Sequence, residues 1–193
     1  MTRTAIVKNT EPTQHDMLGV YLNDHLAGAT AGSELAHRMA RSYRGREESD
    51  PLSRLAVEIA QDRSALLAIM ASLGVTVRAY KVGVAWIGEK VGRLKLNGRL
   101  LGRSPLSDLE ELELLRLGVE GKAAGWRTLR ALADIDTRLD VGRLDELISR
   151  ARSQADQLED LRTHAASRVI SHPSAPGPAT LDRAADRKGL TGP

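Results

Sequence analysis

The sequence predicts an all-α protein, and within that class a four-helix bundle. Four long stretches have apolar residues at the spacing that places them on one face of a helix. Two of the connections between these stretches are short and one is long, an arrangement that bundles use. Aromatic residues make up only 3% of the chain and Phe is absent, so the core has to consist of Leu, Ala, Val and Ile, which suits closely packed helices.

The composition excludes several classes of site. The chain of 193 residues contains 41% hydrophobic and 27% charged residues, which is ordinary for a globular protein. Cysteine is absent, which excludes disulfides, thiolate nucleophiles and cysteine-bound zinc or iron–sulfur clusters. The net charge of +3 is modest, and few aromatic rings are present on which single-stranded bases could stack. Nucleic acid is therefore not expected as a partner.

Neither a signal sequence nor a membrane span is expected. The first residues, MTRTAIVKNTEPTQ, contain no apolar run of the kind that secretory signals have. The longest uninterrupted apolar run, Ala65–Ala71, is far shorter than the roughly 20 residues that a membrane-spanning helix needs. A cytoplasmic location is therefore the expectation.

The first two helices are expected over residues 14–43 and 51–73. Asp50 followed by Pro51 is typical of a helix start, with Asp50 as the N-cap. Gly74 stands where a left-handed residue usually ends a helix. The second helix has the clearest apolar 3-4 spacing, which is formed by Leu52, Leu55, Ile59, Leu66, Ile69 and Leu73.

Residues 75–105 carry five glycines and an excess of basic side chains. We interpret them as a helical crossover to about residue 96, followed by an irregular connection. An alternative is a tight turn at Asn97-Gly98 between two short extended segments. The basic residues between Lys81 and Arg103 would suit phosphate groups, but we interpret them as a solvated face of the crossover.

The third helix is expected to begin at Ser104-Pro105 and to run to about residue 133, and the fourth covers residues 141–170. Residues 172–193 contain four of the seven prolines and predict a disordered tail. The predicted organisation is a polar N-terminal lead over residues 1–13, a helical bundle domain over residues 14–171 and the C-terminal tail over residues 172–193.

Polar residues interrupt the apolar faces of the predicted helices. Asp62 replaces an apolar residue in the second helix, and Glu58 lies one turn earlier near the edge of the same face. His25 takes a similar position in the first helix. In the third helix, Glu113 and Glu120 belong to a charged stripe between two apolar ones. These groups would meet inside a bundle, where an unpaired carboxylate is very costly to bury. Their partners must then be basic side chains or a metal ion.

This arrangement resembles that of ferritin-like proteins, in which four helices supply Glu and Glu-x-x-His ligands to two iron ions. The chain contains one such motif, Glu34 to His37, on the outward side of the first helix. The resemblance implies that the long crossover makes the second and third helices parallel. It also implies an iron or manganese site, for which the candidate ligands are His25, Glu58, Asp62, Glu113 and Glu120.

The preferred interpretation is a non-enzymatic helical protein without a cofactor. Its inward carboxylates would form a buried ionic network with arginines from the set Arg63, Arg116, Arg127 and Arg162. Such a protein would act through self-association or a protein partner. A homodimer with Trp126 near its interface is expected, because the third helix carries apolar residues on several sides. The alternative is a carboxylate-bridged metalloprotein that binds iron or manganese.

Overall fold

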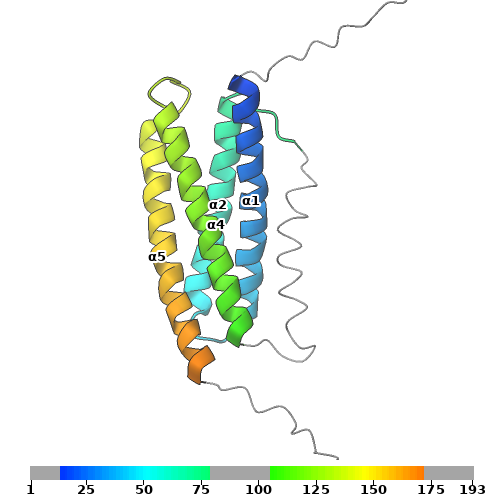
Figure 1. The fold of residues 1–193 in the computed structure, drawn as a ribbon, viewed down its shortest axis with the longest axis vertical. Coiled ribbons are helices and arrows are strands. Elements are labelled where there is room, and N and C mark those ends of the chain that lie inside the picture. The colour runs from blue at the N-terminus through cyan, green and yellow to red at the C-terminus, as the bar shows by residue number, and fades with distance from the viewer. Residues whose placement is uncertain (1–13, 79–104, 172–193) are drawn as a thin grey trace, which may run out of the picture.

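The computed structural model describes residues 14–78 and 105–171, and every regular element in these two ranges is a helix (Figure 1). The helices are α1 (Gln14–Ser42), α2 (Ser49–Ser72), α4 (Pro105–Leu132) and α5 (Val141–Ser171). The all-α prediction with four helices is confirmed for this part of the chain, with ends close to those expected. The predicted N-terminal lead, C-terminal tail and all but the first residues of the crossover lie outside the described residues.

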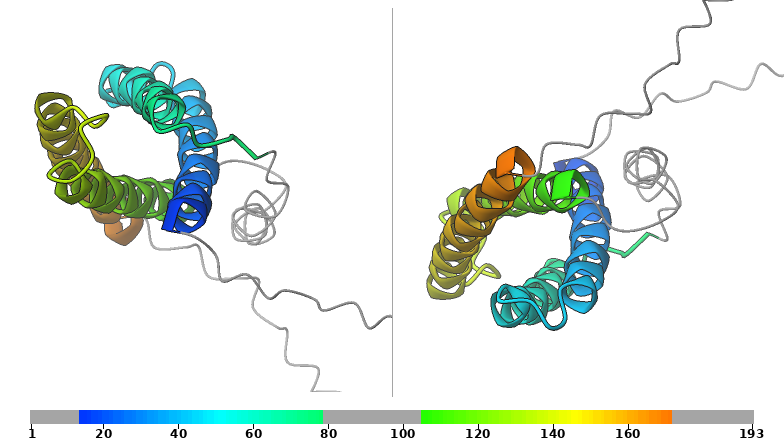
Figure 2. Two further views of the ribbon diagram at one scale, coloured as in Figure 1. Left: turned by 90° about the horizontal axis from the view of Figure 1, so that it is seen from above. Right: turned by 90° about the horizontal axis from the view of Figure 1, so that it is seen from below.

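The four helices form two antiparallel pairs. Figure 1 shows α1 and α5 running in one direction, and α2 and α4 in the other. Seen end on in Figure 2, the order around the bundle is α2, α1, α4, α5. The contacts are extensive within the pairs α1/α2 and α4/α5, fewer between α1 and α4, and few between α2 and α5. The parallel directions of α2 and α4 are those expected for helices joined by a long crossover.

A single hydrophobic core contains side chains from all four helices. Its members are mainly Leu, with Ala, Ile, Val and Met and two aromatic residues, Tyr43 and Trp126. Trp126 is only 2% exposed, so it lies in the core, and its predicted place at a subunit interface is wrong. No helix in the described ranges is long and apolar enough to cross a membrane.

The face that α4 buries differs from the predicted one. Its buried apolar residues are Leu112, Leu115, Val119, Ala123, Trp126 and Leu129. Leu117, a member of one of the two apolar stripes that flank the charged stripe of the predicted helix, is 67% exposed. The charged stripe that begins at Glu113 therefore faces outward, because the helix is rotated relative to the predicted orientation.

The ends of α2 agree only in part with the sequence signals. The helix begins at Ser49, and its N-cap residue is Glu48, which makes no capping hydrogen bond with its side chain. Asp50 is thus in the first turn rather than at the N-cap. In the first turn its negative charge still interacts favourably with the positive end of the helix dipole. Gly74 has a φ of 70°, as expected for a left-handed residue after the helix.

Polar side chains bind the segment after α2 and the loop before α2 to the helices through hydrogen bonds and ion pairs. The buried side chain of Asn23 donates to the carbonyl of Thr76 (3.1 Å) and accepts from the N–H of Arg78 (2.7 Å). In the loop between α1 and α2, Arg46 pairs with the buried carboxylate of Asp108 on α4 at 2.7 Å. The Arg46–Asp108 contact, together with an ion pair between Glu48 and Arg168, links the first helix pair to the second.

Candidate functional site

Asp62 lies in the interior of the bundle, only 1% exposed. Lys122 on α4 donates to its Oδ2 at 2.5 Å, and Arg150 on α5 donates from Nε to its Oδ1 at 2.8 Å. A second hydrogen bond from Arg150 Nη2 reaches the same Oδ1. The prediction that Asp62 is buried within reach of basic groups is confirmed, but these groups are Lys122 and Arg150 and not the predicted Arg63, Arg116, Arg127 or Arg162.

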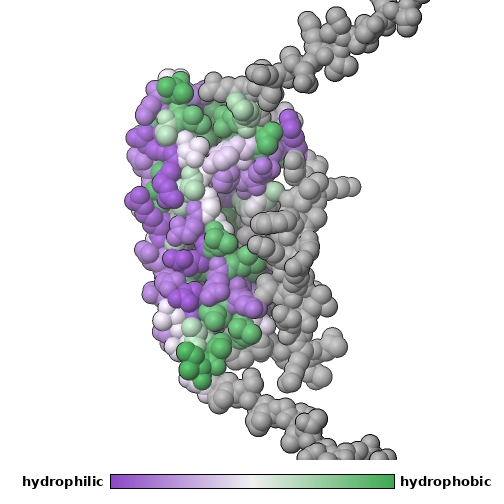
Figure 3. Space-filling model, in the orientation of Figure 1, coloured by the Kyte–Doolittle hydropathy of each residue, from purple (hydrophilic) through white to green (hydrophobic). Residues whose placement is uncertain are grey.

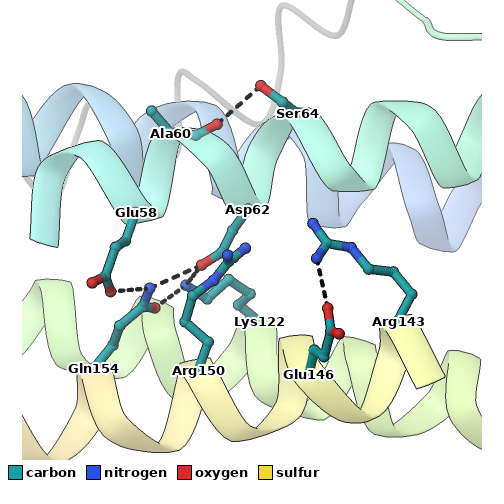
Figure 4. Close-up of polar contacts among 9 residues, drawn as sticks. All are labelled: Glu58, Ala60, Asp62, Ser64, Lys122, Arg143, Glu146, Arg150 and Gln154. Carbon is teal, nitrogen blue, oxygen red and sulfur yellow. Dashed lines mark hydrogen bonds and ion pairs between the residues drawn. The ribbon is translucent and has the colours of Figure 1, made fainter.

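Gln154 on α5 completes this arrangement (Figure 4). Its amide nitrogen donates to Asp62 Oδ2 and to Glu58 Oε2, each at 3.1 Å, and its carbonyl oxygen accepts from Lys122 Nζ. The Asp62 network thus consists of Glu58, Asp62, Lys122, Arg150 and Gln154, and it joins three helices. Two carboxylates face two cations, so the network is neutral as a whole.

The acids and bases of the Asp62 network are paired with one another. Each oxygen of Asp62 accepts at least two hydrogen bonds, so neither is directed at a substrate or a metal ion. Burial lowers the pKa of Lys122, and the nearby negative charge of Asp62 opposes this shift. A lysine that is hydrogen-bonded to both Asp62 and Gln154 is a poor nucleophile.

The structure does not bring the five predicted metal ligands together. Glu113 and Glu120 are about half exposed, at 53% and 47% of their side chains, and face away from Asp62. There they belong to a surface cluster with Arg116, Glu159 and Arg162. Within residues 14–78 and 105–171, no three His, Asp or Glu side chains are close enough to hold a metal ion.

His25 lies at the contact between α1 and α4. Its ring packs edge-on to Tyr21, with 4.4 Å between the ring centroids. A Cβ atom at Gly125 would come within 3.0 Å of the ring, so a side chain at position 125 would crowd the imidazole in its observed position. Burial lowers the pKa of His25 although the charge of Asp24 opposes the shift, so the ring is mainly neutral at pH 7.

Three members of the network were missed from the sequence, and two of them carry a signal. Lys122 interrupts a regular apolar series on α4, which runs through Leu112, Leu115, Val119, Trp126 and Leu129. Gln154 interrupts the equivalent series on α5, which runs through Leu147, Ala151, Leu158 and Leu161. This is the same signal that identified Asp62. Arg150 has no such signal, because its long side chain reaches the interior from the edge of its helix.

A cavity of about 530 Å³ lies between α1 and α4. We call it the α1/α4 cavity. Apolar residues form most of its wall, with polar groups contributed by Tyr21, His25, Asp62, Lys122 and Trp126. It opens to the surface, because residues of its rim such as Asp24 and Leu117 are exposed. Mostly apolar walls with a few polar groups are typical of small-molecule sites, which have volumes of roughly 300–1,000 Å³.

The walls of the α1/α4 cavity contain glycines that the described structure does not require. Five helical glycines line it, namely Gly28, Gly32, Gly118, Gly121 and Gly125. All but Gly125 have no atom within 4 Å of the place where a Cβ would lie. None of them has a positive φ. In a helix each of these glycines is about 1 kcal/mol less favourable than alanine. At four of the five positions, neither packing nor backbone conformation explains this cost.

Trp126, which also lines the α1/α4 cavity, has a second unexplained cost. Its indole N–H is buried and has no hydrogen-bond partner among the described residues. A buried donor without a partner costs about 1–3 kcal/mol, and native proteins contain few of them. Two other polar groups of the wall differ, because Tyr21 Oη donates to Thr128 and Lys122 Nζ donates within the Asp62 network.

The volume, the mostly apolar wall and the four unexplained glycines make the α1/α4 cavity the candidate functional site. Comparison of the chain with protein-family models, with curated proteins and with solved structures finds no match, so the geometry of this site is the basis for its function.

Proposed function

We propose that the protein is a non-enzymatic helical binding protein whose α1/α4 cavity holds a small, largely apolar molecule. The observation that carries the proposal is the coincidence of a 530 Å³ cavity with four glycines that the surrounding packing does not require. Glycine in a helix is useful where another molecule has to approach the backbone closely. A bound molecule would therefore account for residues that otherwise only weaken the helices.

The Asp62 network supports the non-enzymatic part of the proposal. It forms one end of the cavity through Asp62 and Lys122, yet its acids and bases are paired with one another. A general base or nucleophile needs a lone pair directed at the substrate, and the pairing leaves Asp62 and Lys122 unsuited to either role. The network instead fixes the positions of α2, α4 and α5, against which the cavity is formed.

The ferritin-like resemblance stays a proposal about topology. The parallel directions of α2 and α4 support it, since a long crossover produces them in that family (Figure 1). The iron or manganese alternative lacks comparable support, because the outward Glu113 and Glu120 cannot join the interior residues at one ion.

A protein partner is the second candidate, as is a second copy of the chain. Large apolar side chains are exposed on the described surface, among them Leu106 (51%) and Ile170 (81%). Figure 3 shows hydrophobic surface among hydrophilic areas at the lower end of α4 and α5, where these residues lie. A protein surface at these residues would not, however, account for the four unexplained glycines of the α1/α4 cavity.

The neutral fluorescent probe N-phenyl-1-naphthylamine tests the proposal. We expect saturable binding with increased probe emission, because the cavity removes the probe from water. The substitution Gly28→Leu should abolish most of this binding, since the new side chain enters the cavity at a position where no protein atom obstructs it.

The matched control is Ala131→Leu, an equal gain in apolar bulk at an exposed position of α4 that does not line the cavity. It should bind the probe as the wild type does, and circular dichroism should show that both variants remain helical. Absence of probe binding to the wild type, or equal binding by the Gly28→Leu variant, would contradict the proposal.

A further inference from the structure

Histidine is the side chain whose charge changes most readily around neutral pH, and His25 belongs to the wall of the α1/α4 cavity. The other titratable side chains that line the cavity are Tyr21 and Asp24 on α1, Asp62 on α2 and Lys122 on α4. Asp62 and Lys122 are paired with each other, so together they add little net charge to the wall. A change of charge in the wall near neutral pH is therefore expected at His25.

The imidazole ring of His25 lies between α1 and α4 with little room around it. A Cβ atom placed on Gly125 of α4 would be 3.0 Å from both Nδ1 and Cε1, so this edge of the ring lies against the helix backbone. Tyr21, one turn earlier on α1, packs edge-on against the ring. His25 is nevertheless only partly buried, and it lines a cavity that opens to the surface. A molecule that fills the cavity would therefore contact His25 and replace water beside it.

A positive charge on His25 is unfavourable in this place. Burial already lowers the pKa of the ring below the ordinary 6.5, and the charge of Asp24 opposes the shift. Asp24 is exposed, so solvent weakens its effect. The wall also contains the carboxylate of Asp62, but Lys122 and Arg150 neutralise it. A bound apolar molecule offers no partner to an imidazolium and removes water from it, which makes the charged form still more costly.

On the basis of the proposed function, we propose that protonation of His25 releases the bound molecule from the α1/α4 cavity. The form that binds has a neutral ring, so the affinity is full at about pH 7.5 and above and falls as the pH drops through the pKa that His25 has in the free protein. One pH unit below that pKa about a tenth of the rings are neutral, and binding is about tenfold weaker. The site thus takes up its ligand at neutral pH and releases it in mildly acidic solution.

Titration with N-phenyl-1-naphthylamine at pH 7.5 and at pH 5.0 tests the inference, because this probe stays uncharged over the range. We expect the full-length wild type to bind about three- to tenfold more weakly at pH 5.0. The His25→Gln variant keeps a polar side chain that does not titrate, so its affinity should differ less than about twofold between the two pH values.

The matched control is His37→Gln, which removes a histidine from an exposed position of α1 that does not line the cavity. This variant should lose affinity at pH 5.0 as the wild type does. Circular dichroism at both pH values should show that all three proteins remain helical.

Nuclear magnetic resonance gives a second measurement, which needs no variant except to assign the signals. The ring C–H resonances of His25 are followed through a pH titration of the wild type, with and without saturating probe. Because ligand and proton compete, each has to weaken the binding of the other by the same factor. The pKa of His25 should therefore lie below 6.5 in the free protein and lower still in the complex. A merely structural role of His25 would not move this pKa on binding.

The two proposals fail in different ways. If the wild type does not bind the probe at pH 7.5, the proposed function and this inference are both wrong. If it binds with the same affinity at both pH values, or if His25→Gln loses affinity at pH 5.0 as the wild type does, only the inference is wrong. If His25→Gln binds the probe at neither pH, the wild-type resonance titration decides. A pKa of His25 that is equal with and without the probe would contradict the inference.

Discussion

Asp62 is the most completely buried of the charged side chains in the described part of the bundle. Its charge is stable there because Lys122 and Arg150 lie on its two sides and Gln154 donates a further hydrogen bond. A buried ion pair adds little net stability compared with apolar residues, but breaking it strands the remaining charges. A loss of stability is therefore expected mainly when one residue of the buried ion pair is removed.

The substitution Asp62→Ala should lower the free energy of unfolding by about 3–5 kcal/mol, because Lys122 and Arg150 would lose their counter-charge in the interior. Glu120→Ala is the matched control. Its carboxylate is half exposed and lies 3.9 Å from Arg116, so its loss should cost less than about 1 kcal/mol. Chemical denaturation measures both values, and similar losses in the two variants would contradict this account of the network.

Asp136, in the turn between α4 and α5, provides a test by pH. Hydrogen bonds from Arg138 lower its pKa to about 2 from the ordinary 3.8. Because the folded-state pKa is the lower one, the stabilisation is complete above about pH 4 and is lost as the pH falls towards 2. The wild type should therefore melt above the Asp136→Asn variant at pH 7, and the gap should close near pH 2. A gap that is the same at both pH values would show that Asp136 titrates normally.

The sequence identified a buried polar side chain where a single polar residue interrupted a regularly spaced apolar series. Asp62 was found in this way, because α2 has only one apolar face with regular spacing. Lys122 and Gln154 interrupt apolar series in the same way. On α4, however, neighbouring leucines form other possible apolar faces, so the buried series could not be recognised. The partners of Asp62 follow from how three helices are rotated about their axes, which depends on packing rather than on any one helix.

α4 is the element for which the sequence prediction failed most clearly. Leucines such as Leu109, Leu114 and Leu117 surround the buried series, so several rotations of the helix would bury a similar apolar area. The orientation observed is the one that places Trp126 in the core and Gly125 against His25. A glycine that allows close approach of two helices thus helps to decide which leucines are buried.

A pair of alanine substitutions on α4 tests this role of glycine. Gly121→Ala should raise the free energy of unfolding by about 0.5–1 kcal/mol, because its methyl group meets no protein atom and alanine favours the helix. Gly125→Ala places a methyl group 3.0 Å from the ring of His25, and overpacking of this kind costs about 1–3 kcal/mol. Urea denaturation should therefore rank Gly121→Ala above Gly125→Ala. Equal stability of the two variants would mean that His25 moves aside freely.

For the whole molecule, the fold class and the approximate helix ends were predictable, because the amphipathic pattern of each helix and its flanking turn residues can be recognised from one stretch of sequence. The order of the helices around the bundle is not local. It depends on contacts such as those of Arg46 with Asp108 and of His25 with Gly125, which join residues far apart in the chain. The cavity was not predicted for the same reason, since its walls come from facing surfaces of α1 and α4.

Self-association stays a prediction for the whole molecule, although Trp126 does not take part in it. Exposed apolar residues such as Leu117 (67%), Ile135 (77%) and Ile170 (81%) remain as candidates for an interface. Sedimentation equilibrium at micromolar concentration should give twice the chain mass of 20.9 kDa. A monomer over the whole concentration range would remove the homodimer from consideration.

The most direct test of the central claim is to map where a small apolar molecule binds. Glycine amides form a separate region of the nitrogen–proton correlation spectrum, so the lining glycines can report on the cavity. Titration with N-phenyl-1-naphthylamine should shift the signals of Gly28, Gly32, Gly118, Gly121 and Gly125. The signals of Gly45 and Gly142, which lie outside the cavity, should stay in place. Shifts at Gly45 and Gly142 without shifts at the lining glycines, or no shifts at all, would contradict the claim that the α1/α4 cavity is a binding site.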